Sequence, residues 1–388
     1  MRTRRKRTVL LAITSATHHG FYRGASRYAI QRHWHVVADT IYASMVPIGW
    51  KGDGILSFVG YWEELANYVK SADVPAVEIS SVRQDLGLPY VGEDNEAIGR
   101  LASEHLLERN FKSFAWAPFW DDQVNEERYL GFSRSLQAAG YECLRLIPVS
   151  NRKAASHSRH LNWTLRRSSL IRAIRALHHP VGIFCYNDYV ATDIMDACIE
   201  AGIRIPQEVA VIGVDNDPIL CECAQVPLTS VRHDLEGMAY QAAALLDRLM
   251  EGQAAPIVPE RIAPKGVITR KSTDVLAIEH PEVAKASRYI QANFVRKDLS
   301  VSSVVEACNL SRRFLEKAFR NELDRSILAE IQRVRMNHAC TLLESTESAI
   351  ATVAMKSGFG NLNHFFRVFR THNKMTPRAF RLANKSAA

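Results

Sequence analysis

The 388-residue sequence predicts a two-lobed α/β domain with parallel sheets, followed by a smaller all-α domain with two helix-turn-helix motifs. Short runs rich in Val and Ile alternate with amphipathic stretches from residue 8 to about residue 273, and beyond residue 281 only helical periodicity remains. Positive charge gathers in this helical end, since Lys285 to Ala388 holds 18 Lys plus Arg against 8 Asp plus Glu. The domains that we predict are residues 1–273, a linker at 274–281, and residues 282–388.

Six strands are expected in the first domain: Val9–Thr14, Gly54–Val59, Ala76–Ser80, Ser113–Ala117, Gly182–Tyr186 and Val209–Val214. Each is followed by a polar or Gly-containing turn and then by a helical pattern. In Asn95 to Leu107, for example, apolar residues recur at three- and four-residue intervals. About 265 residues of this alternation indicate two lobes rather than one sheet.

Polar residues close two of these strands, and the carboxyl ends of parallel strands are where such sheets bind ligands. Cys185-Tyr186-Asn187-Asp188 ends one strand, and Gly213-Val214-Asp215-Asn216-Asp217 ends another. Carboxylate and amide groups can hold sugar hydroxyls through paired hydrogen bonds, and an Arg can donate to their oxygens. Arg128 is the candidate donor. Helix capping is the alternative role for each Asp or Asn taken singly.

Catalytic motifs are missing from the sequence, which contains no GxGxxG, GxxxxGK[ST], GxSxG or HExxH. We therefore expect no catalytic residues and no cofactor. The pairs His18-His19 and His178-His179 are adjacent, so their side chains diverge and we expect no metal site. The alternative is a sugar-acting enzyme with an accessory basic domain, which would use Asp188 and Asp215 as acid and base.

The cysteines and the N-terminus indicate a cytoplasmic protein. Seven cysteines without a metal-site spacing predict unpaired thiols in a reducing compartment. The apolar stretch Val9–Ile13 is too short for the hydrophobic region of a signal peptide, and no run approaches the length of a membrane span. We expect no membrane association.

A first helix-turn-helix is predicted at about residues 300–322. Ser300 can cap a helix over Val301–Cys308, and Ser311 can cap a second helix that ends at Leu323. The inward side chains expected on that second helix are Phe314, Leu315, Ala318 and Phe319.

The same plan recurs at about residues 348–371. Ser348 can cap Ala349–Lys356, Gly358 supplies the turn, and Asn361 can cap a helix over Leu362–Arg370. Setting Ser311 against Asn361 aligns the apolar and the basic positions of the two copies, which arise together by chance far less often than one copy does.

The outward residues of the two second helices are the predicted DNA contacts. In the first motif these are Arg312, Arg313, Glu316 and Lys317, with Arg320 on the same side. In the second motif they are Asn361, Asn363, His364, Arg367 and Arg370. Arg can bond guanine and Asn adenine in the major groove, whereas Lys and peripheral Arg more often meet phosphate. A protein partner in place of DNA would leave the duplication unexplained.

Residues 299–381 resemble the DNA-binding domain of the AraC/XylS regulators. The resemblance rests on Ser357-Gly358-Phe359, on Phe365-Phe366-Arg367-Val368-Phe369 and on Met375-Thr376-Pro377-Arg378-Ala379-Phe380-Arg381, which occur in the order of that family. Phe380 stands where Tyr is usual.

The first domain resembles the ligand domain of LacI-type repressors, which is itself similar to periplasmic sugar-binding proteins. The resemblance rests on Asp53-Gly54-Ile55-Leu56, Val91-Gly92-Glu93-Asp94-Asn95, Tyr186-Asn187-Asp188-Tyr189-Val190-Ala191, Val211-Ile212-Gly213-Val214-Asp215-Asn216-Asp217 and Pro227-Leu228-Thr229-Ser230-Val231. A periplasmic-binding-protein-like domain followed by an AraC-type domain is similar to the arrangement in xylose operon activators.

This resemblance implies a sugar-responsive activator of a pentose operon, with a xylose-like effector and double-stranded DNA as partners. It also implies a homodimer, in which the ligand changes DNA binding, and RNA polymerase as a further partner. By the resemblance, Arg128, Asn187, Asp188 and Asp215 match sugar-facing positions. The loop Ser15 to Phe21 departs from the family pattern, which leaves the identity of the sugar open.

Overall fold

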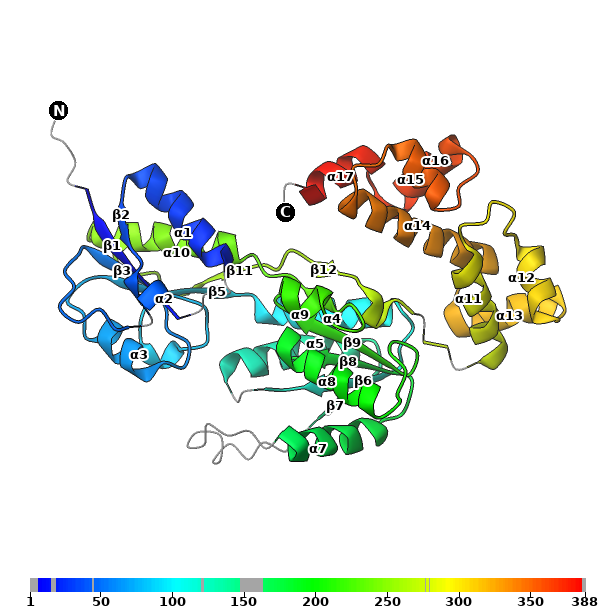
Figure 1. Ribbon diagram of the computed structural model, residues 1–388, viewed down its shortest axis with the longest axis horizontal. Helices are drawn as coiled ribbons and strands as arrows, with labels where there is room; N and C mark the ends of the chain where they lie inside the picture. The colour runs from blue at the N-terminus through cyan, green and yellow to red at the C-terminus, as the bar shows by residue number, and fades with distance from the viewer. Residues whose placement is uncertain are drawn as a thin grey trace. The chain divides into compact units, whose positions relative to one another are not determined.

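The computed structural model describes residues 6–14, 19–43, 45–119, 122–146, 163–275, 277–278 and 280–385. The chain divides into two compact units, Met1–Ala277 and Ile278–Ala388 (Figure 1). The division falls inside the linker predicted at residues 274–281.

The first unit contains two six-stranded sheets. The first sheet has the order β11-β5-β4-β3-β1-β2. Its strands are β1 (Thr8–Ile13), β2 (His35–Val37), β3 (Gly54–Phe58), β4 (Ala76–Ile79), β5 (Tyr90–Glu93) and β11 (Glu260–Ile262). All its pairings are parallel, with Leu10 opposite Ile55 and Ile55 opposite Ala76, for instance.

The second sheet has the order β12-β10-β9-β8-β6-β7. Its strands are β6 (Ser113–Ala117), β7 (Cys143–Arg145), β8 (Val181–Cys185), β9 (Val209–Val214), β10 (Thr229–Val231) and β12 (Val267–Ile268). Only β12 runs antiparallel to its neighbour among the described pairings. The two parallel-sheet lobes predicted from the alternating pattern are therefore present.

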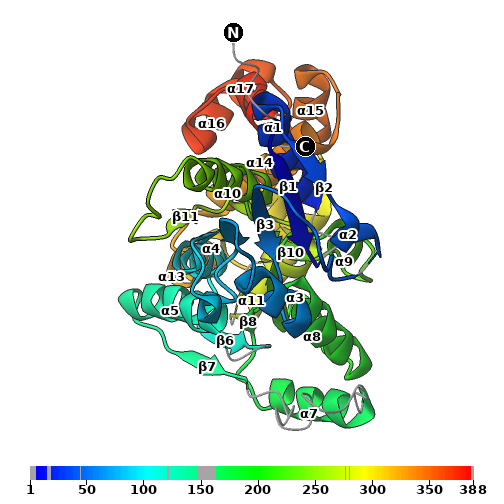
Figure 2. The same ribbon diagram turned by 90° about the vertical axis from the view of Figure 1, so that its left-hand side faces the viewer.

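Helices cover both sheets. Those of the first lobe are α1 (His19–Arg32), α2 (Asp39–Ala43), α3 (Glu63–Lys70) and α10 (Leu235–Met250). Those of the second lobe are α4 (Asn95–Leu107), α5 (Gln123–Ala138), α7 (Trp163–Arg175), α8 (Asp188–Glu200) and α9 (Pro218–Glu222). Helices α1 and α10 pack side by side, as Figure 2 shows. Their apolar faces meet one side of the first sheet in a shared core.

The chain crosses between the lobes three times: after β5, after β10 and after β11. The first lobe is therefore built from residues 8–93 together with residues 235–262. Because all three crossings leave from the carboxyl end of a parallel strand, the polar residues that follow those strands gather at the junction of the lobes.

The second unit is helical throughout its described part. Its helices are α11 (Pro281–Asn293), α12 (Val301–Cys308), α13 (Arg312–Leu323), α14 (Ile327–Ser345), α15 (Ile350–Lys356), α16 (Leu362–Asn373) and α17 (Pro377–Lys385). Ser300, Ser311 and Asn361 cap α12, α13 and α16 through their side-chain oxygens, as predicted.

Two sequence-based expectations in this unit are wrong. Ser348 does not cap a helix, because α15 begins at Ile350 and Ala349 occupies the N-cap without a side-chain bond. The Ser348 carbonyl instead accepts a hydrogen bond of 2.6 Å from Arg381. Phe314 is not inward: its side chain is 48% exposed and contacts the His280 ring, with 6.1 Å between the ring centroids.

Candidate ligand site and DNA-binding surface

Two glycines bring α4 and α5 into backbone contact, and this contact positions Arg128. A Cβ on Gly99 would lie 2.2 Å from the Arg128 carbonyl oxygen, and a Cβ on Gly131 would lie 2.1 Å from the Glu96 carbonyl oxygen. Any larger residue at either place would push the helices apart. The close approach brings the Arg128 side chain on α5 next to Asn95, the first residue of α4.

Arg128 is almost completely buried at the junction of the lobes. Its Nε donates to Asn95 Oδ1 at 3.0 Å, and its Nη1 donates to the Tyr186 carbonyl oxygen at the end of β8. Its guanidinium also lies over the Tyr186 ring, 5.2 Å from the ring centroid. A buried guanidinium with these partners is held rigidly, as a recognition group for a polar ligand requires.

Asp215 is joined to Arg128 through His233, which the sequence analysis missed. His233 Nε2 lies 2.9 Å from Asp215 Oδ1 and 3.4 Å from Arg128 Nη2, and the imidazole is buried. His233 follows β10 by two residues, in a stretch without a recognisable motif. The three side chains form a line of charged and polar groups along the carboxyl ends of β8, β9 and β10.

The turn that carries Asp215 has an unusual backbone conformation, because φ is +110° at Asp215 and +55° at Asn216. Such angles cost free energy for residues other than glycine and persist only where neighbours hold them. Ser230 Oγ accepts from the Asn216 amide at 3.0 Å. From the other side, Arg270 donates to Asn216 Oδ1 at 2.9 Å.

Asp188 lies beneath this turn and has no exposed surface. Its Oδ1 accepts from Ser230 Oγ at 2.6 Å, and its Oδ2 accepts from the Asp217 amide at 2.9 Å. Burial, followed by the nearby charge of Asp215, raises the pKa of Asp188 to about 7. The structure thus places this predicted ligand residue behind the Asp215 turn, with its oxygens directed at protein groups.

Asn187 caps helix α8, since its side chain accepts from the Val190 amide at 3.0 Å. This is the capping role that the sequence analysis left open. Of the four predicted ligand residues, the structure brings Arg128 and Asp215 together through His233, with Arg128 buried and Asp215 partly exposed. Asp188 is buried beneath the Asp215 turn, and Asn187 is half-buried where it caps α8.

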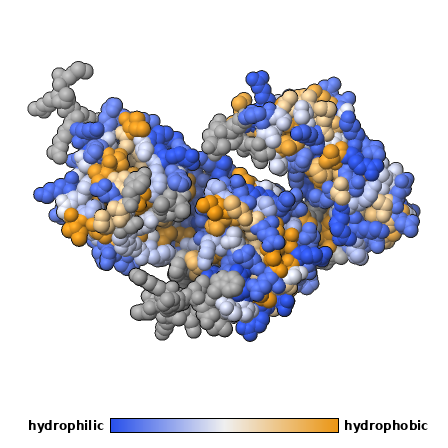
Figure 3. Space-filling view, in the orientation of Figure 1, coloured by the Kyte–Doolittle hydropathy of each residue, from blue (hydrophilic) through white to orange (hydrophobic). Residues whose placement is uncertain are grey.

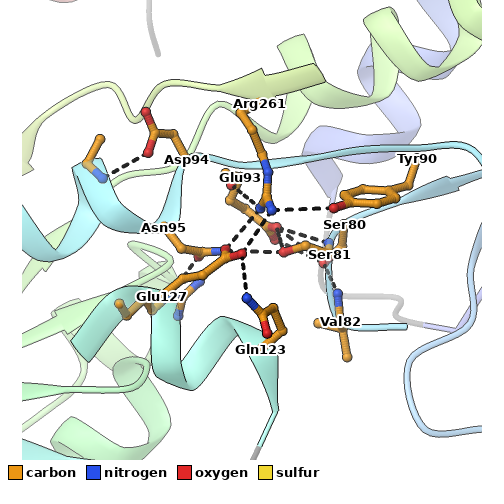
Figure 4. Close-up of polar contacts among 12 residues, drawn as sticks. Ser80, Ser81, Val82, Tyr90, Glu93, Asp94, Asn95, Gln123, Glu127 and Arg261 are labelled. Atoms are coloured by element: carbon orange, nitrogen blue, oxygen red, sulfur yellow. Dashed lines mark hydrogen bonds and ion pairs between the residues drawn. The ribbon is translucent and has the colours of Figure 1, made fainter. Parts of the chain in front are cut away.

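A second polar cluster lies at the junction, on the side of the first lobe (Figure 4). Arg261 on β11 reaches across to Glu127 on α5, with Nη2 2.9 Å from Oε1 and Nη1 3.0 Å from Oε2. Asn95 also donates to Glu127, at 3.0 Å. Figure 4 shows Ser80 and Ser81 turned toward the Glu93 carboxylate, which ends β5. The cluster ties the two lobes together by a bidentate ion pair.

Asp122 makes a further connection between the lobes. Its Oδ2 accepts from the Tyr61 hydroxyl of the first lobe at 2.6 Å and from the Tyr186 hydroxyl of the second lobe at 3.0 Å. Burial, and then the hydrogen bond to Asp122, raises the pKa of Tyr61 well above its usual value. Both hydroxyls therefore remain neutral donors at physiological pH. Aromatic rings beside such hydroxyls can stack on an apolar sugar face and bond its rim.

The described residues contain no group of three or more His, Cys, Asp or Glu side chains that could hold a metal ion. No helix in the described part of the chain is both long and apolar enough to span a bilayer.

In the second unit, the predicted DNA contacts lie on two exposed helix faces. On α13 they line a shallow depression of about 540 Å³ together with Asn321. The residues in this depression are Arg312, Arg313, Glu316, Lys317, Arg320 and Asn321. Arg312 Nε donates to Glu316 Oε1 at 2.9 Å within the face. Leu315 and Phe319 are buried on the opposite side, so the helix is amphipathic as expected.

On α16 the exposed predicted contacts are Asn363, Arg367 and Arg370, with Asn361 just before the helix. His364 is half-buried against the Phe359 ring, at 6.0 Å between centroids. Two apolar residues, Leu362 and Phe366, are also exposed on this face, by 41% and 39%, and were not among the predicted contacts.

The second motif is fixed to the rest of its unit at Gly358. This residue has φ of +80°, and a Cβ there would lie 2.1 Å from the Phe294 carbonyl oxygen. The same carbonyl accepts from Arg335 Nε at 2.9 Å, while Arg335 Nη2 donates to the Arg296 carbonyl at 2.7 Å. Arg335, on α14, therefore satisfies carbonyl groups at the end of α11, next to the turn of the motif.

Comparisons with known proteins agree with this division. A family model of a periplasmic binding protein-like domain matches residues 103–273, and a helix-turn-helix domain matches residues 304–383. The xylose operon regulatory protein of Haemophilus influenzae is 30% identical over 295 residues, which is 76% of this chain and 75% of that protein.

Two further relatives match nearly end to end. The xylose operon regulatory protein of Escherichia coli K12 is 28% identical over 396 residues, covering 99% of both chains. A solved structure described as the xylose-binding transcription activator xylR matches with a TM-score of 0.65 and 26% identity, covering 99% of this chain and 100% of that one. The chain therefore belongs to the family of the xylose operon regulatory proteins.

Proposed function

We propose that the chain is a cytoplasmic transcription activator that binds xylose or a related pentose at the junction of its lobes and double-stranded DNA through both helix-turn-helix motifs. It acts as a homodimer and engages RNA polymerase, and it catalyses no reaction. Sugar binding favours one arrangement of the lobes, and that preference changes the affinity for DNA.

The observation that carries the proposal is the presence, in one chain, of a polar strand-end site and two basic recognition faces. Arg128, His233 and Asp215 offer charged and neutral partners of the kind that sugar hydroxyls use. The acid–base alternative is disfavoured because Asp188 is fully buried and its oxygens face protein donors. A carboxylate in that position cannot reach a substrate.

The DNA-binding part is tested with a duplex that the wild-type protein selects from a random-sequence pool. We expect the double variant Arg313→Ala/Arg367→Ala to bind this duplex at least tenfold more weakly in fluorescence anisotropy. If the lost contacts are phosphate contacts, the slope of log affinity against log salt falls by about 0.9 for each.

Arg296→Ala is the matched control, because it removes an exposed charge that pairs with Asp298 and lies on neither recognition helix. Its affinity should stay near wild type. The assignment of both recognition helices fails if the double variant keeps the wild-type affinity and the wild-type salt dependence.

The sugar-binding part is tested by thermal shift with D-xylose, L-arabinose, D-ribose and D-glucose. A pentose at about 100 times its Kd should stabilise the folded chain by about 2.7 kcal/mol and raise its Tm by several degrees. Asp215→Ala should abolish the shift, while the exposed control Asp73→Asn retains it. A shift with sugar phosphates and none with neutral sugars would contradict the proposed chemistry of the site.

A further inference from the structure

The two recognition helices occupy equivalent places in their motifs but present different chemistry. When Ser311 is aligned with Asn361, each row of residues spaced four apart on α13 matches a row on α16. The row on α13 is Arg312, Glu316 and Arg320, and the matching row on α16 is Leu362, Phe366 and Arg370. The neighbouring row is polar on both helices, because Arg313 and Lys317 align with Asn363 and Arg367.

The apolar pair on α16 is a surface feature and takes no part in closing the core. The core side of the helix is supplied by Phe365 and Phe369, which are both fully buried and pack with their ring centroids 5.5 Å apart. Leu362 and Phe366 are about two-fifths exposed. Figure 3 shows apolar residues at the surface around α15 and α16, whereas the surface over α12 and α13 is mainly hydrophilic.

The surroundings of this pair suit the major groove of DNA. Leu362 is the first residue of α16, and the N-terminal residues of a recognition helix face the base edges. Arg367 and Arg370 lie beside the pair on the exposed face and carry the positive charge that the phosphate backbone attracts, and Asn363 adds a neutral hydrogen-bonding group. The basic residues of this face can attract a polyanion, and the apolar pair can contact apolar groups that the same polyanion exposes.

Thymine is the base that offers such a group, because its C5-methyl projects into the major groove and accepts contact with Phe and other apolar side chains. Over a guanine or a cytosine, Leu362 and Phe366 would bury the donors and acceptors of the base. Those groups would lose their hydrogen bonds to water and gain none in exchange. We propose that Leu362 and Phe366 contact thymine methyl groups, so that the second motif reads a thymine-containing half-site.

The first motif has no counterpart to this pair. At the equivalent positions it carries Arg312 and Glu316, which are joined by a 2.9 Å hydrogen bond. Arg312 can donate to a base edge or a phosphate and Glu316 can accept from a base edge, but neither offers an apolar contact of this kind. The two half-sites therefore differ in the chemistry that is read. This inference rests on the proposed DNA-binding function.

The test replaces thymine by deoxyuracil, which removes the methyl group and leaves every hydrogen-bonding edge in place. Each thymine of the duplex selected by the wild-type protein is replaced singly, and affinity is measured by anisotropy with D-xylose in excess. We expect a group of neighbouring positions at which replacement weakens wild-type binding by about fourfold for each methyl. Phe366→Ala and Leu362→Ala should each lose that sensitivity at one or more of these positions.

Leu328→Ala is the matched control, because Leu328 is an exposed apolar residue on α14, outside both recognition helices, and its variant should keep the wild-type sensitivity. The thymine replacements are first measured with the wild-type protein, so the misfolding of a variant cannot decide that result. The inference is overturned if no thymine is sensitive to replacement, or if both variants retain the sensitivity. Leu362 and Phe366 would then be assigned to a contact with another protein. Failure to select any duplex would instead overturn the DNA-binding function itself.

Discussion

Gly358 lies in the turn of the second helix-turn-helix, and replacing it by Ala perturbs that motif at one defined point. The residue has φ of +80°, which Ala adopts only with strain. The added Cβ would lie 2.1 Å from the Phe294 carbonyl oxygen and 2.8 Å from Arg335 Nε. Because the nearest atom is backbone, the clash is relieved only if α15 or the end of α11 moves.

The cost follows from two contributions. The left-handed backbone angle costs about 1–2 kcal/mol for a residue with a Cβ. Overpacking against a fixed backbone adds about 1–3 kcal/mol. We therefore expect Gly358→Ala to destabilise the second unit by about 2–5 kcal/mol, which is a large fraction of the 5–15 kcal/mol that typically holds a domain together.

Urea denaturation followed by two probes separates the units. All six Trp residues lie within Met1–Ala277, so Trp fluorescence reports the first unit, whereas far-UV circular dichroism also follows the helices of the second. In Gly358→Ala we expect part of the dichroism change to move to lower urea while the fluorescence transition stays in place. The sugar-induced thermal shift should persist, and affinity for the selected duplex should fall.

Gly360→Ala supplies the comparison, because that glycine lies two residues away and a Cβ on it would meet no heavy atom within 4 Å. It should unfold like the wild type. If Gly358→Ala also unfolds like the wild type by both probes, the close contact between Gly358 and Phe294 does not exist in solution, and the account of how the motif is anchored is wrong.

Three other perturbations give distinct outcomes. Asp188→Ala leaves Ser230 Oγ and the Asp217 amide without their acceptor, so unfolding should become easier by about 2–4 kcal/mol and the sugar-induced thermal shift should shrink. Glu78 is buried and its pKa is raised from 4.5 to about 7, mainly by burial, so the folded state holds its proton more tightly than the unfolded chain. Stability that is present below about pH 4.5 should therefore be lost progressively, by about 3 kcal/mol, as the pH rises to 7, and Glu78→Gln should flatten this dependence in urea titrations at several pH values. Arg335→Met should cost the second unit about 1.5–3 kcal/mol by dichroism-monitored melting, because two carbonyls lose a charged donor.

The sequence predicted the elements whose signals are local. The six expected strands lie within one residue of β1, β3, β4, β6, β8 and β9, and three of the four expected caps are present. Strands β2, β7, β10 and β11 have three residues each and β12 has two. So short a stretch carries no measurable period, and it becomes a strand because a longer neighbour offers free backbone groups.

The candidate sites show the same division. Arg128 and Asp215 were recognisable from residue type and position, but His233 joins them only through the fold. Leu362, Phe365, Phe366 and Phe369 follow the spacing of a helix face, so periodicity alone turns all four inward. Which two are buried depends on how α16 is rotated against α14 and α15, and that rotation is a tertiary property. The periodicity therefore did not identify Leu362 and Phe366 as exposed, although the proposed thymine contact depends on them.

The first lobe is built from two segments that lie far apart in the sequence, and this separation sets the order in which the chain can fold during synthesis. Strands β1 to β5 leave the ribosome early, but α10 follows only about 140 residues later and β11 about 170 residues later. At 5–20 residues per second, that delay lasts roughly 10 to 30 s. Throughout it, β5 remains an edge strand, and Val9, Leu11 and Val91 lack the Met238 side of their core. The lobe that is begun first is thus completed only just before the recognition helices are made, and its nascent apolar face is a target for chaperones in that interval.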